Sequence, residues 1–464
     1  MTEVDYLVVG AGTAGMAFTD ELISNSGHTV LMVDRRHAPG GHWNDAYPFV
    51  RLHQPSAFYG VSSRNLGANR IDEWGPNAGL YERATGLEVC SYYQSVMQER
   101  FLQSGRVTFR PMTECRTGDG AATLTSLLTG ESSEIKVRKK IVDARYLEGS
   151  IPATHRRSFA VDEDVRCIPV NELVHADHWA DRYVVIGGGK TGMDACLWLM
   201  DNGVAPEAIQ WVRPHDAWII PREKVQPLDL IPTFLISWAE SVEACAAASD
   251  VTDLFRRLES HGHLTRIDLS VDPTMYRAAS ASKGELDALR RIERVTAGEH
   301  VRRIASDRIH LEHSDTAVSG RPLYVDCTAA AITTPPERPV FQDGRITIQT
   351  VRAPSPSFNA ALAGYLEATR DDPAEQNYFA PPTRHPRIAA GWIRNRLNSM
   401  VAASRWSEAA DIARWVGTTR LSITAGAGKF AGEPEVAAAL KTSETLNEAA
   451  RQNLATLAES VPDS

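Results

Sequence analysis

The stretch Tyr6-Leu7-Val8-Val9-Gly10-Ala11-Gly12-Thr13-Ala14-Gly15 decides the fold of this chain. Four apolar residues predict a buried strand, and three glycines with the spacing G-x-G-x-x-G follow it directly. Residues 16–23 then show helical spacing of apolar side chains, and a second apolar run over 30–33 ends in Asp34. Strand, glycine turn, helix and strand in this order predict a βαβ unit of the Rossmann type.

Each position of this turn has a physical role in binding a dinucleotide. Gly10 permits the tight bend, Gly12 lets the backbone approach a pyrophosphate, and Gly15 lets helix and strand pack closely. The diphosphate would then lie at the positive helix end around Ala14. Asp34 would accept hydrogen bonds from a ribose diol and repel a 2′-phosphate, which favours FAD or NAD. The alternative is a structural glycine turn that binds nothing.

The same pattern returns 177 residues later in the chain. An apolar run over 183–186 leads into Gly187-Gly188-Gly189-Lys190-Thr191-Gly192, a helix is expected over 193–201, and a strand over 209–212. We expect a second dinucleotide at this turn, in contact with Gly187, Gly189, Lys190, Thr191 and Gly192. The chain is therefore predicted to be an α/β protein with two Rossmann-like domains.

The second unit has a cation where the first has an acid. Arg213 stands at the end of the second strand, where an arginine can bind a 2′-phosphate, so NADPH is favoured over NADH. Lys190 would add positive charge near the pyrophosphate or the phosphorylated ribose. The alternative is that Arg213 is an ordinary exposed charge at a strand end, and Asp216 nearby supports that alternative.

Length and pattern divide the chain of 464 residues into three parts. We assign residues 1–160 to the first part of an FAD-binding domain. Residues 161–330 form the NAD(P)H-binding domain, with a helical insertion over about 222–300 that could cover a substrate. Residues 331–464 return to the FAD domain and end in a helical region.

Composition excludes several classes of protein. The formal charge of −9 lacks the basic character of a nucleic-acid-binding protein, and no apolar run is long enough to span a membrane. The first residues do not resemble a secretion signal, so we expect a cytoplasmic protein. The six cysteines stand singly, which argues against a disulfide scaffold, a redox cysteine pair and a zinc site. We predict no metal site.

Several further stretches resemble the flavin-containing and Baeyer–Villiger monooxygenases. The run Pro39-Gly40-Gly41-His42-Trp43-Asn44-Asp45-Ala46-Tyr47-Pro48 resembles the family's G-G-x-W…Y-P segment, with Asp34-Arg35-Arg36 as its lead-in. Ala217-Trp218 with Arg222, and Asp326-Cys327-Thr328-Ala329, resemble later elements of that family. The resemblance covers about 1–60, 140–225 and 320–370. It implies that Arg35, Gly41, His42 and Trp43 contact FAD.

In this layout the segment 49–59 would return along the flavin ring. It places Arg51, His53 and Gln54 among aromatic residues, which suits a site that bonds the flavin or accepts a substrate proton. We take these three as candidate catalytic residues and Gln54 also as a cofactor contact. The alternative is that Arg51 and His53 are core-edge residues satisfied by backbone carbonyls. Met112, and Asn359 in a Pro/Ser loop that leads into a helix, complete the expected cofactor contacts.

The resemblance implies an NADPH-dependent FAD monooxygenase. NADPH would reduce FAD, the reduced flavin would take up O₂, and a C4a-(hydro)peroxyflavin would oxygenate a nitrogen, a sulfur or a ketone of a small molecule. We also consider a homodimer. Two alternatives stay open: an NAD(P)H-dependent flavin reductase or dehydrogenase without productive oxygenation, and a flavin-binding sensor protein.

Overall fold

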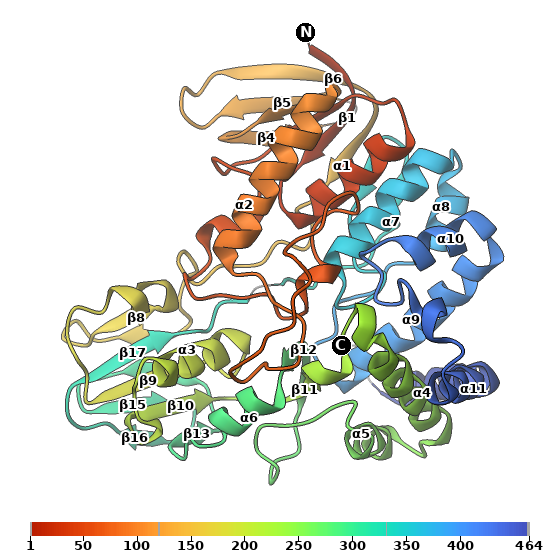
Figure 1. Cartoon of the computed structure of the whole chain (residues 1–464). Coiled ribbons are helices and arrows are strands. Elements are labelled where there is room, and N and C mark those ends of the chain that lie inside the picture. Colours follow the sequence, from red (N-terminus) through yellow and green to blue (C-terminus); the bar gives the residue numbers. More distant parts are fainter. Residues whose placement is uncertain (1, 119–120, 331, 462–464) are drawn as a thin grey trace.

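Two sheets, each containing one of the glycine turns, form the framework of the molecule (Figure 1). The structure is a computed structural model that describes residues 2–118, 121–330 and 332–461. The first sheet has the order β18-β19-β6-β1-β2-β3. Its strands are β1 (Thr2–Val9), β2 (Val30–Val33), β3 (Val107–Arg110), β6 (Ser132–Asp143), β18 (Phe341–Gln342) and β19 (Arg345–Thr347), and the antiparallel strands β4 (Thr113–Thr117) and β5 (Ala121–Ser126) extend it along β6.

The second sheet is entirely parallel and has the order β13-β10-β9-β17-β8. Its strands are β8 (Cys167–Pro169), β9 (Arg182–Ile186), β10 (Ile209–Arg213), β13 (Val295–Ala297) and β17 (Pro322–Asp326). The chain leaves the first sheet after β6 and rejoins it only at β18, so the second sheet is inserted into the first domain. The predicted α/β fold with two Rossmann-like units is confirmed, while the predicted domain borders stay predictions.

The third glycine of each turn shows why this residue type is needed. α1 (Thr13–Asn25) and α3 (Lys190–Asp201) follow the two turns. A Cβ on Gly15 would lie 1.9 Å from the carbonyl oxygen of Gly10, and one on Gly192 would lie 2.1 Å from that of Gly187. Any side chain would therefore push the helix away from its strand.

The stretch over 222–300 is helical only in part. It contains α4 (Ile231–Ala247), α5 (Val251–Ser260) and α6 (Lys283–Leu289), but also β12 (Met275–Ala281), which pairs with β11 (Ala217–Pro221). β13 at its end belongs to the second sheet, because parallel pairing with β10 completes that sheet's edge. The expected helical insertion is therefore interrupted by β12 and ends with α6. A further small sheet follows the order β16-β15-β14-β7, with β7 (Ala160–Val161), β14 (Val301–Ile304), β15 (Arg308–Leu311) and β16 (Asp315–Ala317).

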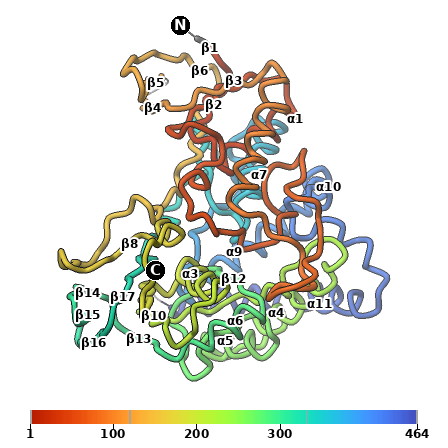
Figure 2. The backbone as a smooth tube through the Cα atoms, turned by 60° about the vertical axis from the view of Figure 1, so that its left-hand side comes forward, coloured from red at the N-terminus to blue at the C-terminus, as the bar shows by residue number. Residues whose placement is uncertain are grey.

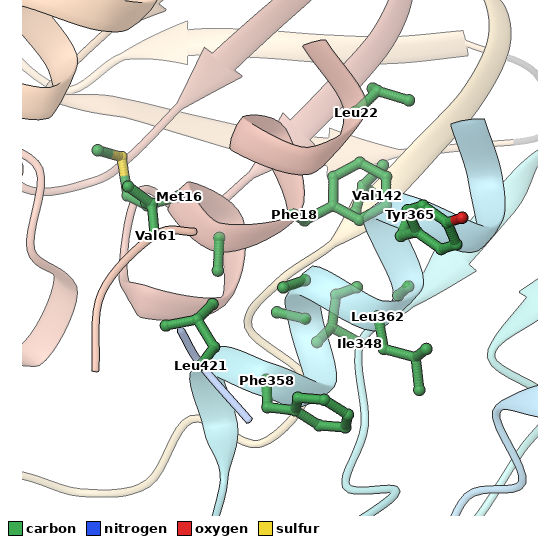
Figure 3. Packing of buried hydrophobic residues seen from close by; sticks show 14 of the residues in the cluster. Met16, Phe18, Leu22, Val61, Val142, Ile348, Phe358, Leu362, Tyr365 and Leu421 are labelled. Carbon is green, nitrogen blue, oxygen red and sulfur yellow. The ribbon is translucent and has the colours of Figure 1, made fainter. Parts of the chain in front are cut away.

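Helices of the C-terminal region cover both the first domain and the insertion. They are α7 (Pro356–Thr369), α8 (Pro373–Phe379), α9 (Ala389–Glu408), α10 (Ala410–Thr418) and α11 (Pro434–Glu459), and α2 (Gly86–Val96) lies beside the first sheet. α7 packs against α1, and Figure 3 shows Phe18, Leu362 and Tyr365 in their shared core. α11 packs against α4. In the part of the chain that the structure describes, no helix is both long and apolar enough to cross a membrane.

Candidate functional site

The first glycine turn is open to a ligand at the start of α1. Gly12 precedes the helix and provides no side chain to cap it, so the first N–H groups of α1 have no capping partner. The predicted contact residue Gly41 lies against the same turn, since a Cβ on Gly41 would be 2.8 Å from the Cα of Gly12. The Gly40 N–H donates to the Ala11 carbonyl over 2.8 Å. The structure therefore brings the turn and the 39–48 segment together, as expected for a diphosphate cradle.

Asp34 lies at the end of β2 beside this cradle. Its carboxylate is buried and accepts hydrogen bonds from the Ala11 N–H at 2.6 Å and the Arg36 N–H at 2.8 Å. Met112 lies next to it, because its N–H donates to the Arg36 carbonyl over 3.1 Å. Arg35 is exposed. The predicted adenosine contacts Asp34 and Met112 are thus adjacent in space.

A group of hydroxyls that sequence reasoning missed surrounds Thr13 within the first turn. The Thr13 hydroxyl hydrogen-bonds that of Tyr59, and the Tyr93 hydroxyl donates to Thr13 over 3.0 Å. The indole of Trp43 donates to the Tyr59 hydroxyl over 2.7 Å. These bonds tie α2 and the 43–59 segment to the start of α1. The only sequence signal is the threonine inside the glycine motif.

Lys190 at the second turn already has an acidic partner within the protein, and its predicted contact with a nucleotide stays a prediction. Its side chain is buried and paired with Asp194, one helical turn further along α3. Asp194 also accepts a hydrogen bond from the Tyr47 hydroxyl over 2.7 Å. Burial and Asp194 hold the pKa of Tyr47 well above its usual value, and Thr191 also bonds this phenol. Lys190 therefore contributes to the contact between the two domains, where its charge is already neutralised.

Arg213 is likewise not the exposed cation that the strand end suggested. Its side chain is 3% exposed, and its Nη2 lies 3.4 Å from Asp216 and 3.9 Å from Asp268. The guanidinium also covers the ring of Trp211 at 4.9 Å. Asp216, the partner of Arg213, is only three residues further along the chain. The predicted phosphate contact of Arg213 stays a prediction, since a phosphate would have to compete with this ion pair.

The candidate catalytic residues His53 and Gln54 line a small cavity between the two domains, together with Pro55, Ile220, Arg222, Val225 and Ser280. The His53 carbonyl accepts hydrogen bonds from Arg222 Nε at 3.1 Å and Ser280 Oγ at 2.6 Å. Desolvation by the surrounding protein, joined by the nearby Lys190 cation, lowers the pKa of His53 to about 3. The ring is therefore neutral at physiological pH and available as a hydrogen-bond acceptor.

A buried ionic network holds this part of the chain against the second domain. Glu285 of α6 receives Arg222 Nη1 and Arg83 Nη2, each at 2.8 Å, and Asn77 Nδ2 at 3.1 Å. Burial alone would raise the pKa of Glu285, but Arg222 and Arg83 lower it to about 2. Figures 1 and 2 show the 47–85 segment reaching from the first domain to this region. The network fixes the backbone that carries His53 and Gln54.

Two of the predicted site residues, Arg51 and Asn359, already bond within the protein. Arg51 is exposed and donates from Nη1 to the Arg83 carbonyl over 3.0 Å, which is the contact that the core-edge alternative describes. The Asn359 amide donates to the Arg352 carbonyl at 3.0 Å and accepts from the Arg352 N–H at 2.9 Å, so it closes the loop before α7. The predicted contact residue His42 is exposed.

Comparison with known proteins supports a nucleotide-binding unit at the N-terminus. Residues 8–62 match the family described as NAD(P)-binding Rossmann-like domain. A ferredoxin–NADP reductase of Salinispora tropica is 37% identical over 92 residues, which is 20% of this chain and 28% of that protein. An open structure of cyclohexanone monooxygenase has a TM-score of 0.46 at 13% identity, covering 99% of this chain and 98% of the other. At this score and identity that structure assigns no activity to the chain.

A mycobacterial protein is similar over most of the length of both chains. The uncharacterised protein Rv2000 of Mycobacterium tuberculosis is 44% identical over 427 residues, which is 91% of this chain and 78% of that protein. The uncharacterised protein Mb2023 of Mycobacterium bovis gives the same figures. Since identity at this level extends over both domains, the chain belongs to the family of the mycobacterial protein Rv2000.

Proposed function

We propose that this protein is an FAD- and NADPH-dependent oxidoreductase that oxygenates a small molecule with O₂. The observation that carries the proposal is the hydrogen bond between Tyr47 and Asp194. It joins the segment beside the first glycine turn to the helix of the second turn. Phe49 also stacks on Trp198 of α3 with ring centroids 5.0 Å apart. Two dinucleotides bound at the turns would therefore meet at one interface.

The residues at the first turn fit FAD. The uncapped start of α1 and the backbone of Gly12 and Gly41 would hold the diphosphate, and Asp34 would bind the ribose. The carboxylate of Asp34 disfavours a 2′-phosphate here. The second turn, with Gly187 and Gly189 before an equally uncapped α3 and Gly192 in the first turn of that helix, would hold NADPH.

When bound, FAD accepts a hydride from NADPH and in its reduced form reacts with O₂. The protein would hold the reacting groups in place and exclude water. Neutral His53 would accept a hydrogen bond from the substrate, and Gln54 beside it would orient that substrate. Lys190 and Asp194 would form a fixed ion pair near this site, because Lys190 is buried and Asp194 also accepts a hydrogen bond from the Tyr47 hydroxyl. We propose a nitrogen, a sulfur or a ketone as the group that is oxygenated.

A second candidate is an NAD(P)H-dependent reductase without productive oxygenation. The observation that favours it is the local similarity to a ferredoxin–NADP reductase. Both candidates require the same electron transfer from NADPH to FAD, so they differ only in the fate of O₂.

The test uses the full chain loaded with FAD. The protein is reduced with NADPH without oxygen and then mixed with O₂ and a panel of amines, sulfides and ketones. We expect oxygenated product from one of these classes, formed with consumption of NADPH. Hydrogen peroxide in equal amount to the NADPH consumed, with every compound, would contradict oxygenation and favour the reductase. A chain that does not take up FAD would contradict both.

A further inference from the structure

Exposed cations gather at the second glycine turn, although the chain as a whole carries a formal charge of −9. Arg277 of β12 lies directly over the turn, because a Cβ on Gly189 would be 3.9 Å from its Nη1. Arg277 and Arg387 are both exposed, and their like charges interact. Among the described residues, no carboxylate lies within ion-pair distance of the Arg277 guanidinium. A cation beside another cation, with no anion of the protein to balance them, is typical of an anion site.

Two histidines continue this surface along the same turn. The Nε2 atoms of His215 and His300 are 3.2 Å apart, and both rings are exposed. A Cβ on Gly188 would lie 2.9 Å from the His215 carbonyl oxygen, so the pair adjoins the turn itself. At this separation the two rings are within hydrogen-bond distance of each other. Burial, His300 and Arg277 together lower the pKa of His215, whereas a bound anion would raise it.

The acids around this surface already have partners. Asp216 is paired with the buried Arg213, and Glu312 accepts a bond from Arg302 at 2.9 Å. Asp268 accepts bonds from Ser270 and also faces Arg213. The charge of the buried Arg213 is therefore balanced by Asp216 and Asp268, whereas the exposed Arg277 has no such partner among the described residues.

We propose that Arg277, together with His215 and His300, binds the 2′-phosphate of NADPH in the place that the strand end suggested for Arg213. The inference rests on the proposed function, because it assumes that the second turn binds a pyridine dinucleotide. In a βαβ unit the end of the second strand lies beside the adenosine ribose. His215 stands two residues beyond β10, and Arg277 reaches over the turn from β12. Together they surround the position of a ribose phosphate.

The test compares nucleotides with and without that phosphate by calorimetry. The probes are adenosine 2′,5′-bisphosphate against AMP, and NADPH against NADH. For Arg277→Leu we expect binding of the bisphosphate and of NADPH to weaken about 10- to 100-fold, and binding of AMP and NADH to change less than about 3-fold. His300→Gln should weaken the same two ligands to a smaller extent. The matched control is Arg303→Leu, which removes an exposed arginine bonded to Asp162 and should change neither pair.

Three results would overturn the inference. An equal loss of all four nucleotides in Arg277→Leu would mean that Arg277 binds the diphosphate or the adenosine. If Arg213→Leu selectively weakened binding of the bisphosphate and NADPH and Arg277→Leu did not, the residue that binds the 2′-phosphate would be Arg213. Wild-type protein that binds the bisphosphate no more tightly than AMP would show that the site does not exist. Failure of the proposed function is distinct, because it would appear as an FAD-loaded protein that binds NADPH and is not reduced by it.

Discussion

At the scale of single residues, the structure contains two cations whose surroundings differ greatly. Lys190 is buried and paired with Asp194, while Arg352 is stacked on the Phe358 ring at 3.8 Å and has no ion-pair partner among the residues that the structure describes. Two of the guanidinium nitrogens of Arg352 are buried without a hydrogen-bond partner, and burial lowers its pKa to about 10. Removing one partner of a buried pair costs more than replacing an unpaired charge.

The Lys190–Asp194 pair gives the first prediction. Asp194→Asn should lower the free energy of unfolding by about 3–5 kcal/mol, because it leaves a buried ammonium without its anion. The matched control is Asp287→Asn, which breaks the exposed pair with Lys283 at the same spacing and should cost less than about 1 kcal/mol. Urea denaturation of both variants measures the difference. Equal effects would mean that Lys190 is not buried as described.

Arg352 gives the opposite prediction. Arg352→Met keeps the contact with Phe358 and removes a desolvated charge, so it should stabilise the FAD-free protein by about 1–3 kcal/mol. The melting temperature of the FAD-free variant measures this change. A lower melting temperature would show that the guanidinium has a balancing partner or a strong ring contact.

At the scale of elements, the glycine turns and their strands could be predicted because each rests on local rules. The spacing of Gly10, Gly12 and Gly15 specifies a bend, a close approach and a helix contact within six residues. β12 and β13 could not be predicted, since both are stabilised by pairing with strands distant in sequence and β13 has only three residues. The partner of Arg213 was visible in the sequence as Asp216, but its burial was not.

The network around Glu285 gives a prediction of pH dependence. The pKa of this carboxyl is about 2 in the folded protein against an ordinary value of 4.5. The stabilisation is therefore complete above about pH 4.5 and is lost as the pH falls toward 2, by up to about 3 kcal/mol. Glu285→Gln should be less stable at neutral pH and should lose less stability between pH 4.5 and 2. Thermal melting curves recorded at neutral and acidic pH measure these changes. The control is Glu312→Gln, which removes the acid of a surface ion pair with Arg302.

At the scale of the whole molecule, the 47–85 segment docks on the second domain and joins the two domains. No periodicity in that segment indicated it, because the contacts are single polar side chains such as Asn77, Arg83 and Tyr47. The two glycine turns were predictable from motifs, and the cofactor contacts assigned to them stay predictions. The contacts between the domains, and the clamp of Arg222 and Ser280 on the His53 carbonyl, depend on tertiary packing.

This docking predicts that one substitution can slow electron transfer from NADPH to FAD without weakening the binding of either cofactor. Ser280→Ala removes one of the two bonds to the His53 carbonyl without changing either glycine turn. FAD and NADPH should bind with affinities changed less than about 3-fold, while reduction of the flavin by NADPH slows about 10-fold, since a small misplacement of reacting groups is costly. Rapid-mixing measurements without oxygen give both quantities. Weakened binding with an unchanged rate would contradict a positioning role for the clamp.

The central claim, that the two nucleotide sites meet at one interface, is tested most directly by the isotope effect on flavin reduction. The FAD-loaded protein is mixed without oxygen with NADPH that carries deuterium at C4 of the nicotinamide, on one face or the other. The account predicts that the visible absorbance of the flavin disappears, and more slowly with one of the two deuterated forms than with ordinary NADPH. Bound NADPH that leaves the flavin oxidised would contradict it.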